Sequence, residues 1–205
     1  MRELLFKDFL AIKVPGLIFL GLLGFFGFYA IALNIVGFLP ALLVLISMML
    51  PLITMIHDEK NKGISHSSRD FKIETFILSK YLLVILALAI GMAVVTGICL
   101  LASFFRANVP VKETFFMVLT GSEIGLLYLS FLLPALYRFG IGRAGSIVLG
   151  LVFLPVFLLM LLSKMGVPLP DLETLKNLPY LLPLFLIILL PVSYKVSLGI
   201  YKEKF

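Results

Sequence analysis

The sequence contains few charged residues, and this scarcity excludes an ordinary soluble protein. Only 14% of its 205 residues are charged, whereas 61% are hydrophobic; a soluble domain carries about 25% charged residues. A chain of this size cannot bury so much apolar surface in one core. The net charge of +6 does not indicate nucleic-acid binding, because the charges lie in short polar segments between long uncharged runs. The composition therefore predicts an integral membrane protein.

The sequence also lacks the patterns of several kinds of chemical site. The single cysteine, Cys99, excludes an internal disulfide and a cysteine-rich zinc site. The two histidines, His57 and His66, have no further ligands around them in a metal-binding pattern. No G-x-x-x-x-G-K-[ST] motif is present, so this chain does not hold ATP in a P-loop. Residues 140–145 match the G-x-G-x-x-G pattern of dinucleotide sites, but no strand precedes them, and a tight turn between two membrane helices explains these glycines better.

Long uncharged runs make up most of the chain. The first, residues 14–56, is too long for one span of about 20 residues, so it predicts two helices with a turn at Asn34 to Gly37. The runs do not alternate with period two, which argues against the strands of a barrel. We therefore predict one all-α domain, residues 1–205, with six transmembrane helices. The expected spans lie near residues 14–33, 37–56, 81–104, 114–137, 146–163 and 178–195.

The basic residues predict how these spans are oriented. An even number of spans places both termini on one side, and the polar segments on that side carry thirteen of the 17 Lys and Arg residues, against four on the other side. Because cytoplasmic loops are enriched in Lys and Arg, both termini are expected in the cytoplasm. Residues 1–13, in which Leu5, Phe9 and Ile12 form an apolar stripe, are expected to lie on the membrane surface as a short amphipathic helix.

The polar segment 57–80 is the longest internal one and the most informative. Asp58 to Lys62 can extend the second helix, and Gly63 can end it as a C-terminal cap. Ser67-x-x-Asp70 resembles a capping box, which predicts a new helix that continues through Ile73 into the third span. The residues leave two interpretations open: a solvated loop, or a docking surface for a cytoplasmic partner.

Glu123 is the one charged residue within the predicted fourth span. An acid at that depth costs about 3 kcal/mol on insertion scales, so it is expected to face a cavity or a polar partner. Two interpretations are open here as well. Glu123 lines an outward cavity, or the span begins later and the acid only bonds to a neighbouring helix.

Two stretches resemble the small ABC type-2 exporter permeases, and the branch of the phenol-soluble-modulin exporters is the most similar. The family pattern E-K-N-G … P-x-S-R … K-Y-L is similar to Asp58-Glu59-Lys60-Asn61, Ser68-Arg69 and Ser79-Lys80-Tyr81-Leu82. Residues 133–140 resemble the L-P-x-x-x-K-F-G run of these permeases. The chain departs from the family at His66-Ser67, where Leu-Pro is usual, and at Arg138, where Lys is commoner. Span count and length also fit, so the resemblance covers nearly the whole chain.

The resemblance implies the permease subunit of an ATP-driven exporter for amphipathic peptides, antibiotics or similar hydrophobic substrates, and not an enzyme. ATP and Mg²⁺ would bind to a separate ATP-binding subunit, so no cofactor or metal is expected in this chain. A second permease chain, identical or different, would complete a dimer in the bacterial plasma membrane. The expected ATPase-coupling residues are Asp58, Glu59, Lys60, Asn61, Lys62, Gly63, Ser68, Arg69, Arg138 and Arg143.

Two other functions are compatible with the residues themselves. A stand-alone secondary transporter or channel would use Glu123 to carry protons and would need no ATPase. A membrane scaffold or immunity protein would transport nothing. A neighbouring gene for an ATP-binding subunit would favour the exporter over both.

Overall fold

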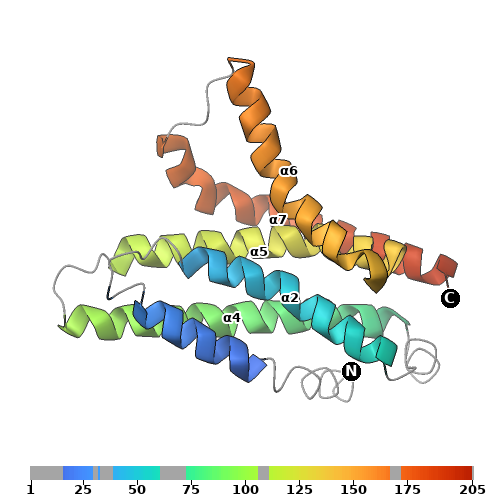
Figure 1. The fold of residues 1–205 in the computed structure, drawn as a ribbon, viewed down its shortest axis with the longest axis horizontal. Helices are drawn as coiled ribbons and strands as arrows, with labels where there is room; N and C mark the ends of the chain where they lie inside the picture. Colours follow the sequence, from blue (N-terminus) through green and yellow to red (C-terminus); the bar gives the residue numbers. More distant parts are fainter. Residues whose placement is uncertain are drawn as a thin grey trace.

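The computed structural model describes residues 16–29, 32, 39–60, 73–105, 111–166 and 172–204, and all regular structure in these residues is helical. The predicted all-α class is confirmed, and the six helices fit the predicted number. The predicted surface helix at residues 1–13 lies outside the described residues. The same is true of residues 61–72, the middle of the polar segment 57–80, which the resemblance implies is the segment that couples to the ATPase and which we call the coupling segment. The helices are Gly16–Tyr29, α2 (Leu39–Lys60), α4 (Ile73–Phe105), α5 (Val111–Phe139), α6 (Ala144–Lys164) and α7 (Leu172–Lys204), with the short 3₁₀ turn η2 (Ile141–Arg143) between α5 and α6 (Figure 1).

The helices are long and apolar enough to cross a membrane. Within the described residues, four of them contain an apolar stretch of sufficient length: Ala41–Asp58, Ile73–Ile98, Phe115–Phe139 and Pro179–Glu203. Helix α6 has 21 residues and a single charge, Lys164, at its end, and at 1.5 Å per residue it is about 32 Å long, close to the thickness of the hydrocarbon core. Several helices also extend past the expected spans, since α4 already begins at Ile73 and α7 continues to Lys204.

Consecutive helices run in opposite directions (Figure 1). The end of α2, the start of α4, η2 and the end of α7 consequently gather at one end of the bundle, which we call the junction end (Figure 1). Helix α5 is central, with its most extensive contacts to α7 and α2. This arrangement is the one expected for an even number of crossings. That the junction end faces the cytoplasm stays a prediction.

The prolines within the helices do not interrupt them. Helix α2 is continuous across Pro51 and α5 across Pro134. A proline has no N–H, so it leaves the carbonyl four residues earlier without its helical hydrogen bond. For Pro134 this is the carbonyl of Ser130, and the hydroxyl of Ser193 on α7 donates a hydrogen bond to it at 2.6 Å. A neighbouring helix therefore supplies the partner that the proline removes, as is common in membrane proteins.

The core lies where α2, α4 and α5 meet. Its fully buried members are aliphatic, among them Leu43, Val84 and Leu129. Helices α2 and α5 are in close contact at Gly125, where an added Cβ would lie 2.9 Å from the Oγ of Ser47. Glycine is required here because any side chain would push the two helices apart.

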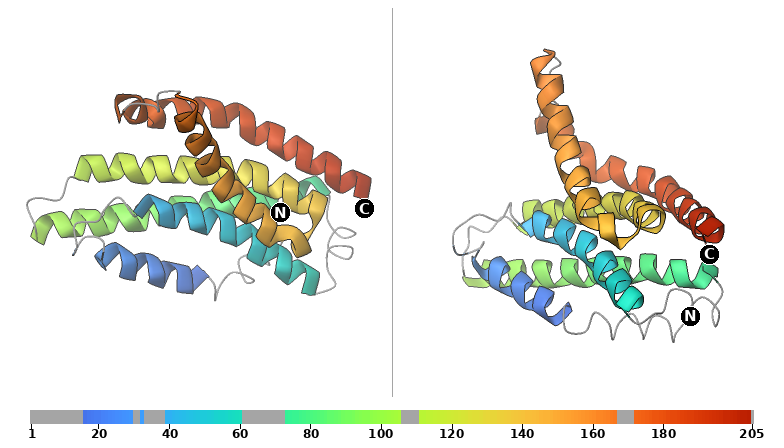
Figure 2. Two further views of the ribbon diagram at one scale, coloured as in Figure 1. Left: turned by 45° about the horizontal axis from the view of Figure 1, so that its top comes forward. Right: turned by 45° about the vertical axis from the view of Figure 1, so that its right-hand side comes forward.

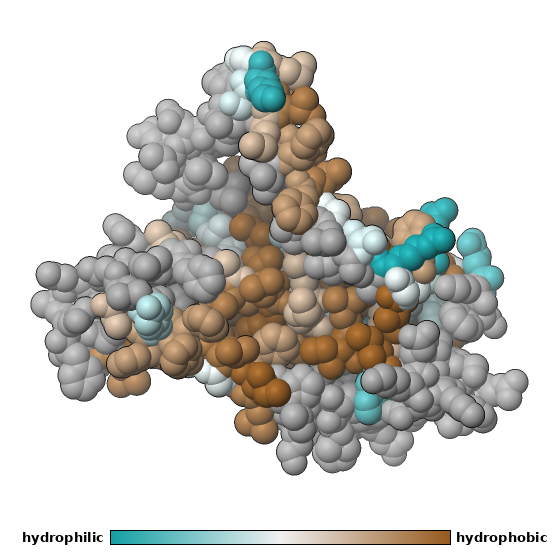
Figure 3. Space-filling model, viewed as in Figure 1, coloured by the Kyte–Doolittle hydropathy of each residue, from teal (hydrophilic) through white to brown (hydrophobic). Residues whose placement is uncertain are grey.

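Helix α6 diverges from the rest of the bundle. It leaves η2 at the junction end and separates from the other helices along its length (Figures 1 and 2). Its middle exposes large apolar side chains, including Phe153, Phe157 and Met160. Figure 3 shows apolar residues over the centre of the visible face, with hydrophilic residues at the junction end and at the tip of α6. Such a surface suits lipid around the middle of the molecule and water at its ends.

Candidate functional site

A buried ion pair joins the end of α2 to the start of α4. The Nζ of Lys80 lies 2.6 Å from Oδ2 of Asp58, and both side chains are at most 2% exposed. These residues stand on either side of residues 61–72, so the pair closes the base of the predicted coupling segment. The carboxylate of Asp58, which the resemblance assigned to ATPase contact, is thus turned into the bundle.

Lys80 makes a second favourable contact. Its Nζ lies 5.2 Å from the ring centre of Phe76, one helical turn earlier on α4, within the range of cation–π attraction. A buried ion pair is costly to desolvate and needs such additional contacts. Lys80 belongs to the run at residues 79–82 that carries the family resemblance, but no pairing with Asp58 was predicted for it. The available signal was two opposite charges at the two ends of one polar segment.

Three aromatic side chains continue from Lys80 across the junction end. Phe76 on α4 lies 5.8 Å from Tyr201 on α7, and Tyr201 lies 5.7 Å from Tyr137 on α5 with their rings at 88°. All three are buried. The edge-to-face geometry is a preferred one for aromatic pairs. No local sequence pattern predicts this cluster, because its members come from three helices far apart in the chain.

The end of α5 presents two exposed arginines. Arg138 lies 5.9 Å from the ring of Phe139, and Arg143 ends η2; both side chains are exposed. Gly140 has φ 77°, a left-handed conformation that suits glycine, and its N–H bonds to the carbonyl of Leu136 at 2.8 Å. This is a helix C-cap, so the glycines at 140 and 142 form the predicted tight turn and not a dinucleotide site.

Most of the other predicted coupling residues cannot be placed. Glu59 and Lys60 are the last residues of α2, and their side chains are outside the described set. The remaining five lie outside the described residues altogether, and their roles stay predictions: Asn61, Lys62, Gly63, Ser68 and Arg69.

A neutral hydrogen-bond network lies next to the ion pair, deeper in the bundle. The Oη of Tyr81 on α4 is 2.6 Å from the Oγ of Ser193 and 3.0 Å from the Oγ of Ser197, both on α7. Ser193 gives its only proton to the carbonyl of Ser130, so Tyr81 donates to Ser193, and Ser197 donates to Tyr81. The network fixes α4, α5 and α7 against one another without any charge.

Glu123 lies on the stripe of α5 that faces α7. This stripe contains every seventh residue of the helix: Phe116, Glu123, Ser130 and Tyr137. Phe116 contacts Tyr180 with ring centres 6.0 Å apart, and the other two positions make the contacts with α7 described above. Glu123 is 5% exposed, and its Oε2 has no hydrogen-bond partner in the described part of the chain. Its helix begins at Val111, well before the acid, and the expected role as a cavity residue stays a prediction.

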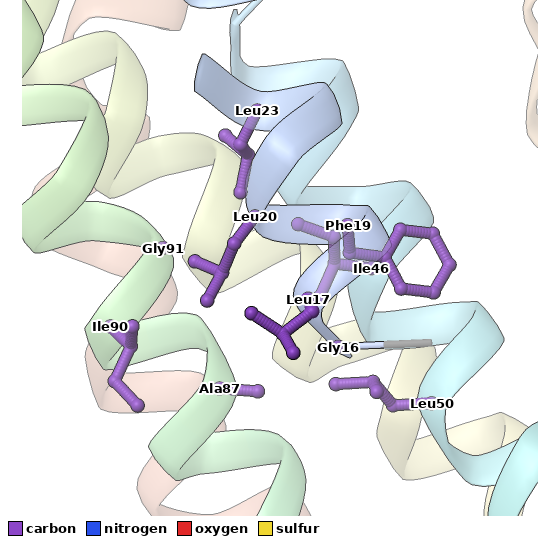
Figure 4. A pocket seen from close by; sticks show the side chains of 10 residues that line it. All are labelled: Gly16, Leu17, Phe19, Leu20, Leu23, Ile46, Leu50, Ala87, Ile90 and Gly91. Carbon is purple, nitrogen blue, oxygen red and sulfur yellow. The ribbon is translucent and has the colours of Figure 1, made fainter. Parts of the chain in front are cut away.

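One apolar cavity of about 300 Å³ lies between Gly16–Tyr29, α2 and α4 (Figure 4). The described side chains that line it are aliphatic or aromatic, such as Leu20, Ile46 and Ile90, with Ala87 and Gly91 leaving space on α4. This volume is at the lower limit of small-molecule sites. Elsewhere in the described residues, no three His, Cys, Asp or Glu side chains come together as metal ligands.

A comparison with known protein families gave a match over nearly the whole chain. The model of a family described as ABC-2 family transporter protein matches residues 3–202 of the chain. The comparisons with curated proteins and with solved structures gave no match.

Proposed function

Because the chain belongs to the ABC-2 family of transporter proteins, we propose that it is the permease subunit of an ATP-driven exporter. The observation that carries this proposal is the polar junction end, where the buried pair of Asp58 and Lys80 supports the predicted coupling segment. The exposed Arg138 and Arg143 stand at the same end (Figure 1). Both predicted contacts with an ATP-binding subunit therefore extend from one end of the bundle.

ABC-2 membership implies an ATP-binding partner and pairing of permease chains in general. Here we propose that ATP and Mg²⁺ bind only to that partner, which docks against the junction end. A second permease chain would pair with this one; the resemblance implies that spans one, two and five, which are Gly16–Tyr29, α2 and α6, line the pathway and the dimer interface. The divergence of α6 from the bundle supports this assignment, since among the described residues α6 contacts chiefly α5 and η2.

The proposed substrates are amphipathic peptides, antibiotics or similar hydrophobic molecules. The apolar lining of the 300 Å³ cavity supports this class, because a site without polar groups discriminates by shape and hydrophobicity. Two of the three helices that line the cavity, Gly16–Tyr29 and α2, are spans that the resemblance places along the pathway; the third is α4.

Charge reversal of both arginines tests the docking. Arg138→Glu together with Arg143→Glu is expected to reduce the ATP-binding subunit recovered with the purified permease by roughly tenfold, because like charges across an interface repel. The control is Lys112→Glu, an equally exposed change at the opposite end of α5. Pull-down in mild detergent, with the partner identified by its P-loop sequence and ATPase activity, measures the effect. Equal recovery in both variants would reject the proposed docking site.

The stand-alone transporter is the second candidate, and the observation that favours it is the buried Oε2 of Glu123, which has no hydrogen-bond partner among the described residues. A proton carrier would lose all transport in Glu123→Gln, which cannot ionise. For the exporter we expect ATP-dependent uptake of an amphipathic test peptide by inside-out vesicles to stay within about twofold of wild type, since glutamine preserves the shape of the side chain. A complete loss, together with dependence on a proton gradient, would favour the carrier.

A further inference from the structure

We propose that Asp58, Lys80, Phe76, Tyr201 and Tyr137 act as one mechanical link between the two predicted ATPase contacts. This five-residue link would make the segment after α2 and the turn after α5 move together when the ATPase closes. Its members are positioning residues: they contact neither ATP nor substrate. The inference rests on the proposed function and adds to it the route by which motion enters the helix bundle.

The first step is the ion pair. Asp58 and Lys80 are 2.6 Å apart and buried at the two ends of the predicted docking segment. Separating them would leave a charge buried without its partner, which is far less favourable than moving both together. A push on the segment between them is therefore transmitted to α2 and α4 as a unit.

The second step is the aromatic path. Phe76 lies under the Nζ of Lys80 and against Tyr201 of α7. Tyr201 in turn meets the ring of Tyr137 edge-on. Tyr137 directly precedes Arg138, and the helix ends at Gly140. A displacement of the α4 start therefore reaches the arginine turn through closely packed rings, which transmit strain because the interior is dense.

The third step concerns why a charged pair, and not apolar side chains, joins α2 to α4. Apolar residues of similar volume would hold α2 and α4 as well or better than a buried ion pair. The neighbouring contacts of Tyr81 with Ser193 and Ser197 hold three helices without charge. A charged pair directly beside Glu59 and Lys60 thus serves something other than stability. A buried charge is stable only next to its partner, so the pair of Asp58 and Lys80 keeps α2 and α4 together when the helix bundle changes between two conformations.

The test replaces the pair by apolar residues in the full complex. Asp58→Leu with Lys80→Met keeps side chains of similar branching and length and removes both charges of the pair. Reconstituted with its ATP-binding subunit, this variant is expected to bind that subunit like wild type but to transport about tenfold less amphipathic test peptide per ATP hydrolysed. The charge-swapped variant, Asp58→Lys with Lys80→Asp, is expected to recover at least half of the wild-type ratio.

A matched control is an exposed ion pair that shares α4 with the buried one. Glu74 and Lys202 form an exposed ion pair of 3.7 Å between α4 and α7, and replacing both by glutamine is expected to leave the ratio of transport to ATP hydrolysis unchanged. Tyr201→Leu interrupts the link independently of the ion pair. Added to the apolar pair, it is expected to cause no further loss, since residues that act as a unit are not additive.

The outcomes separate this inference from the proposed function. A wild-type ratio in the apolar variant, or losses that add with Tyr201→Leu, would overturn the link while leaving the exporter intact. Loss of ATPase binding in the apolar variant would make Asp58 a direct contact and would also overturn it. If wild-type permease binds no ATP-binding subunit at all, the proposed function fails first and the link fails with it.

Discussion

Lys80→Met is expected to lower the free energy of unfolding by about 3–5 kcal/mol, because it leaves the buried carboxylate of Asp58 without its cation. Asp58 is 2% exposed and cannot reach water unless the end of α2 moves. The added apolar contacts of methionine do not offset this charge. A loss of this size is a large part of the stability of a small domain.

Combining Lys80→Met with Asp58→Leu is expected to recover most of the loss, since no charge then stays buried. Unfolding in mixed micelles, followed by circular dichroism, measures all three proteins. Lys202→Met breaks the exposed pair with Glu74 and should change stability by less than about 1 kcal/mol. If Lys80→Met and Lys202→Met cost the same, the 2.6 Å pair is not buried in the folded protein.

Two single cysteines are expected to react with a membrane-impermeant thiol reagent from opposite sides of the membrane. Gly142 lies in the exposed turn before α6 and Met165 just after it, 74% exposed. Because α6 is about one membrane thickness long, one position faces the cytoplasm and the other the exterior. The charge distribution predicts that position 142 is the cytoplasmic one.

The measurement uses Cys99→Ala as a background, since Cys99 is the one native cysteine. In intact cells, Met165→Cys should be labelled almost fully and Gly142→Cys only after lysis. Labelling of both from the outside would contradict the membrane crossing of α6. The opposite pattern would invert the whole topology and place the junction end outside the cell.

Hydropathy alone predicted which residues form helices, because the requirement for backbone hydrogen bonding in lipid leaves little choice. It did not predict where the helices end. The expected third span began at residue 81, but α4 begins at Ile73. The charges of Glu74 and Lys80 set the start of the expected uncharged span, but they do not prevent the helix from beginning earlier. The predicted helix that runs through Ile73 into the third span is confirmed from Ile73 onward, and its predicted capping residues, Ser67 and Asp70, lie outside the described residues.

The site was predictable only where its signal was local. The glycine turn after Arg138 could be read from six consecutive residues, and Gly140 confirms it. The pairing of Asp58 with Lys80 depends on two helices meeting, and no local pattern encodes that. The same holds for Tyr81, although Ser193 and Ser197, one helical turn apart on α7, were a visible polar pair within an apolar run.

The hydrogen bond from Ser193 to the Ser130 carbonyl has a consequence for biogenesis. Helix α5 is synthesised and inserted long before α7, and Pro134 leaves it with an unsatisfied carbonyl in the meantime. Tyr81, on the still earlier α4, likewise has no hydrogen bond to Ser193 until α7 is inserted. The nascent chain therefore cannot complete its structure helix by helix as it leaves the ribosome. The third and fourth membrane segments, α4 and α5, can form these hydrogen bonds only after α7, the last segment, has been inserted.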